Sequence, residues 1–124
     1  MGPPRLTPHA YVLAVPDLAR STIYFEDVLG FQRLWDDPGN WQAMGRDGVR
    51  VMLGRCPDAI PPAKLGDHSY FAYVEVDDLD AFHAEIAAKG AILLFPPKDQ
   101  PWGRREMGVA TPDGHRMMFA AVAP

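Results

Sequence analysis

Val15-Pro16-Asp17-Leu18 and Val76-Asp77-Asp78-Leu79 decide the fold, because each begins the same pattern of elements. In both stretches an apolar, strand-like run ends at a valine, and an aspartate follows that can cap a helix. The first and last two residues of each stretch recur 61 positions apart, and Gly30 and Gly90, where the helices would end, lie 60 apart. The sequence therefore indicates an internal duplication.

Each copy continues with three strand-like runs after its predicted helix. They are residues 31–35, 41–45 and 49–53 in the first copy and residues 91–95, 105–111 and 116–121 in the second. Asp47-Gly48 and Asp113-Gly114 are good turn formers between the last two runs of each copy. With the preceding strands at 11–15 and 70–76, the pattern predicts an α+β fold of two βαβββ modules.

The chain is expected to form a single domain over residues 1–124, since 124 residues of which 48% are apolar suit one hydrophobic core. Module one is predicted at about 8–54 and module two at about 68–122. Residues 55–67 contain Pro57, Pro61 and Pro62 and show neither helical nor strand periodicity, so they are predicted to be the linker.

Charge and composition exclude several classes of partner. The formal net charge is −4 without basic blocks, so nucleic acid is not expected to bind. Cys56 is the only cysteine, which leaves no intrachain disulfide. The N-terminus lacks the apolar core of a signal peptide and no apolar run reaches the roughly 20 residues of a membrane span. We expect a cytoplasmic protein that does not enter membranes.

Two motifs resemble the vicinal oxygen chelate superfamily, which includes glyoxalase I, extradiol dioxygenases and bleomycin-resistance proteins. The first runs from Val15-Pro16-Asp17-Leu18 through Tyr24-Phe25 to Gly30-Phe31. The second, residues 100–107 followed by 111–115, contains Trp102-Gly103-Arg104-Arg105-Glu106 and is similar to the bleomycin-resistance branch. The resemblance implies that each module forms a curved mixed sheet around a cavity, and that enzymes of the family bind a divalent metal ion with His and Glu.

The positions that hold the metal ligands in those enzymes carry other residues in this chain. Counting from the family motifs places Ala10, Met52, Phe71 and Met118 at these positions. None is a good ligand for a hard or borderline divalent ion, because a thioether is a soft ligand. The family's metal site is therefore predicted to be absent, and no cofactor is expected.

An alternative set of metal ligands is His9, His68 and Glu106. Side chains alternate along a strand, so His9 would point away from the face of Ala10, and His68 would likewise oppose Phe71. Polar residues at strand ends are the simpler interpretation of both histidines. Glu106 follows Arg104 and Arg105, and the sequence favours an ion pair that holds strands or subunits together.

Trp102 is the first candidate for a ligand contact. Trp102 lies between Pro101 and Gly103 in a predicted loop. An indole ring exposed to solvent there is unfavourable unless it stacks on another group. In the bleomycin-resistance proteins that the motif resembles, the matching tryptophan contacts a flat heteroaromatic part of the drug. The remaining candidates are aromatic or methionine residues that core packing would also explain: Trp35, Trp41, Met52, Phe71, Tyr73 and Met118.

The sequence thus favours a metal-free protein that binds and sequesters a planar small molecule such as bleomycin. A cationic ligand would suit the acidic chain and Asp36-Asp37 between two tryptophans. No residue is assigned a catalytic role, because neither His83 nor His115 has a nearby acid or nucleophile in sequence that suggests a triad. The alternative is a metal-dependent lyase, isomerase or dioxygenase of the same superfamily. Relatives build their clefts from two chains, so a homodimer is predicted.

Overall fold

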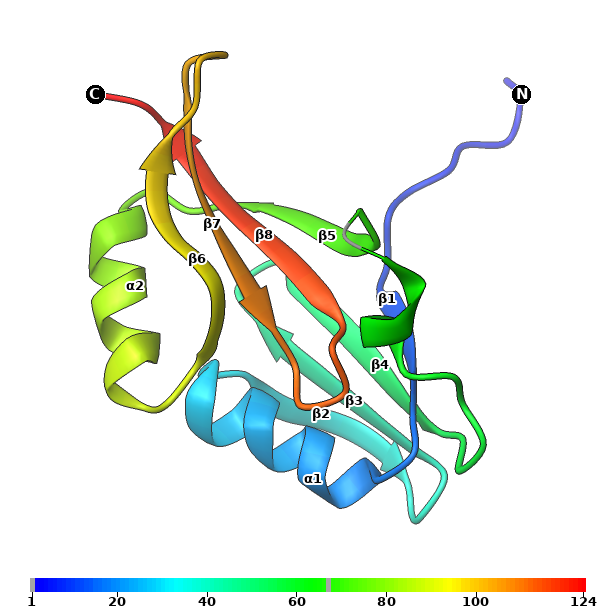
Figure 1. Ribbon diagram of the computed structural model, residues 1–124. Helices are drawn as coiled ribbons and strands as arrows, with labels where there is room; N and C mark the ends of the chain where they lie inside the picture. Colours follow the sequence, from blue (N-terminus) through cyan, green and yellow to red (C-terminus); the bar gives the residue numbers. More distant parts are fainter. Residues whose placement is uncertain (1, 67) are drawn as a thin grey trace.

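A computed structural model describes residues 2–66 and 68–124, and it contains the two predicted βαβββ modules (Figure 1). The first module comprises β1 (Tyr11–Val15), α1 (Leu18–Ile23), the π-helical turn η1 (Tyr24–Val28), β2 (Gln32–Asp37), β3 (Trp41–Arg46) and β4 (Val49–Arg55). The second comprises β5 (Tyr70–Glu75), α2 (Leu79–Ala88), β6 (Ile92–Asp99), β7 (Arg104–Ala110) and β8 (Arg116–Val122).

Both helices begin and end at the residues that the repeat indicated. The Asp17 carboxylate accepts a hydrogen bond from the Arg20 backbone N–H at 3.0 Å, and Asp78 accepts one from Ala81 at 3.0 Å. Gly30 and Gly90 then turn the chain with φ angles of 74° and 88°, which favour glycine because it has no Cβ. The only departure is that the last helical turn of the first module is π-helical rather than α-helical.

Each module forms a four-stranded mixed sheet. The strand orders are β1-β4-β3-β2 and β5-β8-β7-β6, with the first and last strands of each module parallel and the other pairs antiparallel. In both modules the first strand and the strand after the helix are therefore sheet edges. The identical order in the two halves confirms the duplication predicted from sequence.

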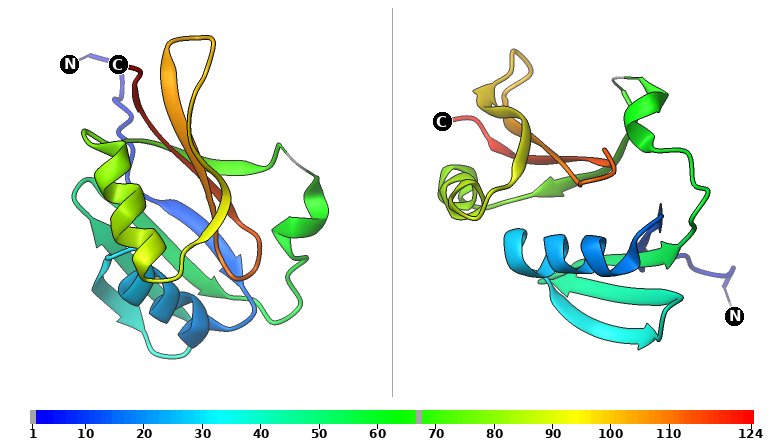
Figure 2. Two further views of the ribbon diagram at one scale, coloured as in Figure 1. Left: turned by 60° about the vertical axis from the view of Figure 1, so that its left-hand side comes forward. Right: turned by 60° about the horizontal axis from the view of Figure 1, so that its bottom comes forward.

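A shared hydrophobic core lies between the two modules. Leu13 and Leu53 from the first sheet and Met107 and Phe119 from the second belong to the same buried cluster. Figure 2 (right) shows α1 on the side of the first sheet that faces the second sheet. Because strand side chains alternate, the opposite side of each sheet is turned away from the core.

Each module's last hairpin contacts the helix of the other module. Arg46 at the end of β3 donates two hydrogen bonds to Glu85 of α2, at 2.6 and 3.1 Å. Asp113 in the β7–β8 turn pairs with Arg20 of α1 and lies 3.4 Å from the Ser21 hydroxyl. These reciprocal contacts hold the two modules in one arrangement.

The structure differs from the sequence prediction in the linker and in the length of β6. The residues expected to be an irregular linker include a short 3-10 helix, η2 (Pro62–Leu65). The strand predicted at 91–95 continues as β6 to Asp99 through Pro96 and Pro97, which an edge strand tolerates because one side needs no N–H donors. Among the described residues no helix is long and apolar enough to cross a membrane.

Candidate ligand-binding site

The face of the second sheet that is turned away from the core carries the strongest candidates, and we call it the second outer face. Tyr73 of β5 lies beside Met118 of β8, and Met118 in turn lies beside Gly108 of β7. The intervening residues, among them Val74 and Phe119, point into the core. Tyr73, Met118 and Glu106 therefore share one surface, because residues two apart on a strand lie on the same face.

Glu106 anchors two of the predicted contact residues. Its Oε2 accepts a hydrogen bond from the Tyr73 hydroxyl at 2.7 Å and one from the Trp102 indole N–H at 3.3 Å. The Glu106 residue is 4% exposed, whereas Trp102 is 63% exposed and Tyr73 48%. The network therefore holds the edge of the Trp102 indole while leaving much of its surface open to solvent.

Arg104 completes this network from the same face. Its guanidinium forms an ion pair with Glu75, and its Nε donates to the Tyr73 hydroxyl at 3.3 Å. The guanidinium carbon lies 5.8 Å from the centre of the Tyr73 ring. Burial raises the pKa of the Tyr73 phenol, and the hydrogen bond to Glu106 raises it further, so the hydroxyl stays a donor at neutral pH.

Within the described part of the chain Glu106 forms no ion pair, so the expected ion pair is not found between strands. Arg104 pairs with Glu75, and Arg105 pairs with Asp80 and Asp99 at 3.0 Å each. Arg105 is one residue from Glu106 and therefore points to the opposite face of the sheet. Glu106 is satisfied instead by neutral donors, which the linear sequence gave no means of locating.

The corresponding surface of the first sheet, the first outer face, carries a second group of predicted residues. Met52 of β4 lies between Val12 of β1 and Ala43 of β3. The Trp41 ring covers Gly54, so closely that an added Cβ there would lie 2.7 Å from ring carbons. Trp35 and Met52 line a small hollow of about 220 Å³ on this face, together with His9.

The two groups of candidate residues do not meet within one chain. Trp35, Trp41 and Met52 belong to the first sheet, and Trp102, Tyr73 and Met118 to the second; in each case the surface faces away from the core that the modules share. Phe71 joins neither group. At a register shift in β5 its ring packs edge-on against Tyr11 at 5.7 Å and near His115 at 6.3 Å.

The residues at the family's metal positions do not fit a divalent ion. Ala10 and Phe71 have no donor atom, and the Met52 and Met118 thioethers lie on different sheets. In residues 2–66 and 68–124 no three His, Cys, Asp or Glu side chains lie close enough to hold a metal ion. The alternative set of His9, His68 and Glu106 is thus not assembled in one chain, and Glu106 already accepts two hydrogen bonds.

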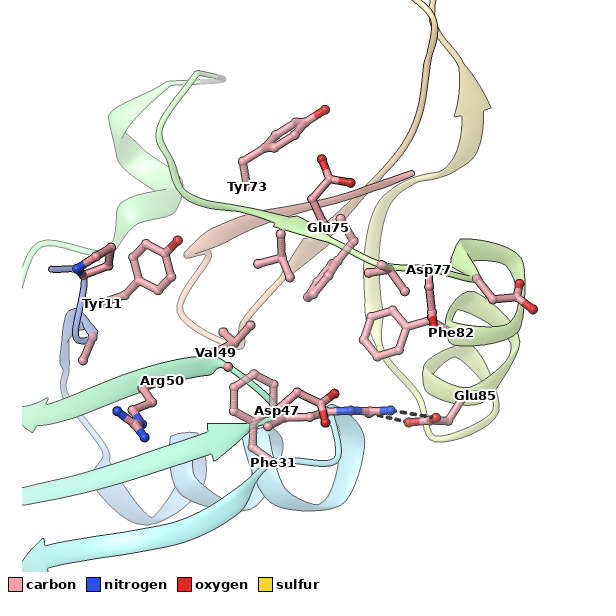
Figure 3. Close-up of a pocket in the computed structure, with 18 of the residues that line it drawn as sticks. Tyr11, Phe31, Asp47, Val49, Arg50, Tyr73, Glu75, Asp77, Phe82 and Glu85 are labelled. Atoms are coloured by element: carbon pink, nitrogen blue, oxygen red, sulfur yellow. Dashed lines mark hydrogen bonds and ion pairs between the residues drawn. The ribbon is translucent and has the colours of Figure 1, made fainter. Parts of the chain in front are cut away.

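A larger cavity, of about 1030 Å³, opens between the two modules. We call it the inter-module cavity. Segments far apart in the chain line it, including residues 8–11, 46–50, 73–78 and part of α2 (Figure 3). Of the predicted contact residues only Tyr73 borders it, and His9 lies at its edge.

Comparison with known proteins identifies the sequence family. The family described as the Glyoxalase/Bleomycin resistance protein/Dioxygenase superfamily matches residues 7–119, which is most of the chain. No curated protein matches the sequence.

Several solved structures share the whole fold. TioX from Micromonospora sp. ML1 is 26% identical, with a TM-score of 0.71 over 95% of this chain and 98% of its own. The bleomycin-binding protein from bleomycin-producing Streptomyces verticillus, solved with copper(II)-bleomycin, is 25% identical, with a TM-score of 0.72 over 97% and 98% of the two chains. TnmS3, an antibiotic binding protein from Streptomyces sp. CB03234, is 23% identical, with a TM-score of 0.72 over 96% and 99%. The chain therefore resembles antibiotic-binding proteins.

Proposed function

Because the chain belongs to the Glyoxalase/Bleomycin resistance protein/Dioxygenase superfamily, we propose that it binds and sequesters a planar small molecule on its second outer face. Sequestration requires an apolar surface and a few well-placed polar groups but no reaction. The likeness to a bleomycin-binding protein at 25% identity supports a ligand of the bleomycin type. The binding is proposed to need no protein-bound metal ion, since the family's ligand positions carry residues without hard donors.

The observation that carries this proposal is the anchoring of Trp102 to Glu106. An indole ring that is 63% exposed would normally move freely, but its N–H is held at 3.3 Å by a buried carboxylate. A ring that is already oriented loses little conformational entropy when a flat ligand stacks on it. The nearby Tyr73 ring and Met118 thioether extend the same surface.

Glu106 supplies a polar contact that would orient the ligand. Both observed hydrogen bonds fall on its Oε2, and no donor in the described part of the chain contacts Oε1. Since no fully buried side-chain oxygen there lacks a partner, Oε1 is not completely buried, although the residue is only 4% exposed. A ligand N–H or cationic group above Trp102 would find this oxygen as its acceptor.

We further propose that the protein is a homodimer whose ligand lies between the second outer face of one chain and the first outer face of its partner. Each face by itself is an open surface with exposed apolar side chains, such as Val12 at 61%, Trp35 at 48% and Tyr73 at 48%. Pairing the faces would enclose a ligand and cover these side chains. Sedimentation equilibrium at micromolar concentration should give the mass of two chains, and a mass of one chain would contradict the shared cleft.

Calorimetric titration with metal-free bleomycin and with copper(II)-bleomycin tests the binding function. We expect saturable binding of at least one form, and a loss of tenfold or more in affinity for Trp102→Ala, as for the loss of an aromatic hot spot. Ile60→Ala is the matched control, because Ile60 is similarly exposed at 70% but lies in the connecting segment. Absence of heat with either form would reject the bleomycin-type ligand. Turnover that chelators abolish would favour an enzyme instead.

A further inference from the structure

The inter-module cavity lies largely apart from the proposed ligand surface and shares Tyr73 with it. Its lining comes from the inner side of β5, from α2 and from the β3–β4 hairpin. In Figure 3 the side chains of Tyr73 and Glu75 lie on the side of β5 away from Phe31 and Val49. The two regions therefore share β5, whose Tyr73 borders both, but lie mainly on opposite faces of this strand.

The apolar part of the cavity lining includes three phenylalanines at the edge of the buried core. Phe31 reaches it from the first module and Phe82 and Phe119 from the second, and the last two rings pack with their centres 4.8 Å apart. The Arg46 guanidinium already lies 5.0 Å from the centre of the Phe82 ring. This contact, made by an arginine that also pairs with Glu85, is an internal example of a cation lying against one of these rings.

The rim of the cavity is acidic. Four carboxylates line it against two guanidinium groups, so the lining carries a net negative charge; the acids are Asp47, Asp77, Asp78 and Glu85, and the bases are Arg46 and Arg50. Glu75 also borders the cavity, but its side chain lies on the other side of β5 and pairs with Arg104. Within residues 2–66 and 68–124, Asp47 and Asp77 take part in no ion pair. Negative charge at the rim of a low-dielectric cavity attracts cations and repels anions.

We propose that the inter-module cavity is a second binding site, which takes an amphipathic organic cation. Its apolar or aromatic body would lie against Phe31, Phe82 and Phe119, and its protonated or quaternary nitrogen would face Asp47 and Asp77. The volume of about 1030 Å³ lies at the upper end of the range, roughly 300–1,000 Å³, that small-molecule sites occupy. This site would function whether or not a ligand binds beside Trp102.

Thioflavin T, an aromatic cation, is a suitable probe for the full-length protein. We expect saturable binding of one thioflavin T per chain, detected by its fluorescence and by equilibrium dialysis.

Asp47→Asn/Asp77→Asn should weaken this binding about tenfold and leave the binding of the anion 1-anilinonaphthalene-8-sulfonate unchanged or stronger. Asn tolerates the φ of 51° at position 47, so the variant should fold. Asp27→Asn/Asp58→Asn, with the same change of net charge outside the cavity, should behave as the parent.

Filling the cavity gives an independent test. Ala81 lines the cavity but is exposed on α2, so Ala81→Trp should obstruct it without disturbing the core and should abolish thioflavin T binding. Ala84→Trp is the matched control, because Ala84 is also exposed on α2 and is not part of the lining. Trp102→Ala should retain full thioflavin T binding, since Trp102 belongs to the other site.

Three results would overturn the proposal. The first is the absence of saturable thioflavin T binding to the folded parent protein. The second is binding that Trp102→Ala abolishes and Ala81→Trp retains, which would place the cation on the second outer face and leave the proposed function standing. The third is binding that becomes tenfold tighter when residues 1–6 are deleted, which would assign the cavity to the chain's own N-terminal segment, with its exposed Arg5 and Leu6.

Discussion

Glu106 is a buried carboxylate whose hydrogen-bond donors within the chain are neutral. Its environment removes water from the charge, and the Tyr73 hydroxyl and Trp102 indole N–H replace part of the lost hydration. The same two hydrogen bonds fix both aromatic rings. At the scale of one residue, the side chain that stabilises this part of the sheet is therefore also the one proposed to orient the ligand.

Replacing Glu106 by alanine should affect both properties. We expect Glu106→Ala to lower the free energy of unfolding by about 1–3 kcal/mol, because the Tyr73 hydroxyl loses its acceptor. It should also increase the mobility of Trp102, which fluorescence anisotropy would report in a Trp35→Phe/Trp41→Phe background. Tyr73→Phe is the comparison variant: it removes one donor but leaves Trp102 anchored. Unchanged anisotropy in Glu106→Ala would show that the carboxylate does not hold the indole ring.

His115 should make stability depend on pH. It is 6% exposed, its Nδ1 lies 2.9 Å from the Thr111 hydroxyl, and burial lowers the pKa of its imidazole below the ordinary value of 6.5. The folded chain thus keeps His115 neutral while the unfolded chain takes up a proton near pH 6.5. Stability from this residue is complete above pH 6.5 and is lost as the pH falls towards the lowered pKa.

Thermal unfolding between pH 7.5 and 5.0 measures this effect. The stability advantage of the parent over His115→Gln should shrink as the pH decreases through this range. His9→Gln, at an exposed position, serves as the control and should follow the parent curve. A constant difference between the parent and His115→Gln at every pH would contradict the assignment.

At the scale of elements, the β7–β8 turn and η2 fit together through Gly114. A Cβ at this position would lie 2.5 Å from the Ala63 Cβ and 2.8 Å from the Ala63 backbone nitrogen, and its φ is 87°. Gly39 has a similar φ of 78° but has no atom within 4 Å of an added Cβ. Comparing the two glycines therefore separates the free-energy cost of the left-handed backbone conformation from the cost of the steric contact with η2.

Alanine substitution at both glycines tests this fit by chemical denaturation. Gly39→Ala should cost about 1–2 kcal/mol, the penalty of a left-handed conformation for a residue with a Cβ. Gly114→Ala should cost about 1–3 kcal/mol more, since η2 must also move away. Equal costs at the two positions would mean that η2 does not pack against the turn in solution.

The repeated elements were predictable from sequence because their signals are local. Capping aspartates and the glycines at the helix ends mark boundaries within a few residues of the chain. The continuation of β6 through Pro96 and Pro97 was not predictable, because proline is tolerated there only as a consequence of the edge position. The partners of Glu106, Tyr73 on β5 and Trp102 in the β6–β7 loop, could not be identified from sequence, because the sheet register that brings Tyr73 to Glu106 is not a local signal.

At the scale of the whole molecule, the arrangement of the modules could not be derived from the repeat. It depends on contacts between distant positions, such as Arg46 with Glu85 and Asp113 with Arg20, whose members lie in different modules. The inter-module cavity results from the same arrangement. The residue types of the proposed site were recognisable from family motifs, but their division between two outer faces became visible only in the folded chain.

This division leads to the central claim, that one ligand is held between the second outer face of one chain and the first outer face of another. Met52→Arg and Trp102→Ala each alter one face, so homodimers of either variant should bind bleomycin at least tenfold more weakly than the parent. Sequential unfolding and refolding of an equimolar mixture would produce heterodimers, in which one cleft carries both changes and the other carries neither.

Titration of bleomycin into that refolded mixture is the most direct test. The shared-cleft account predicts that parent-like affinity returns for about one quarter of all clefts, because half of the dimers are then mixed and each has one intact cleft of two. If the mixture binds no better than the two variants measured separately, the faces do not combine between chains and the central claim is wrong.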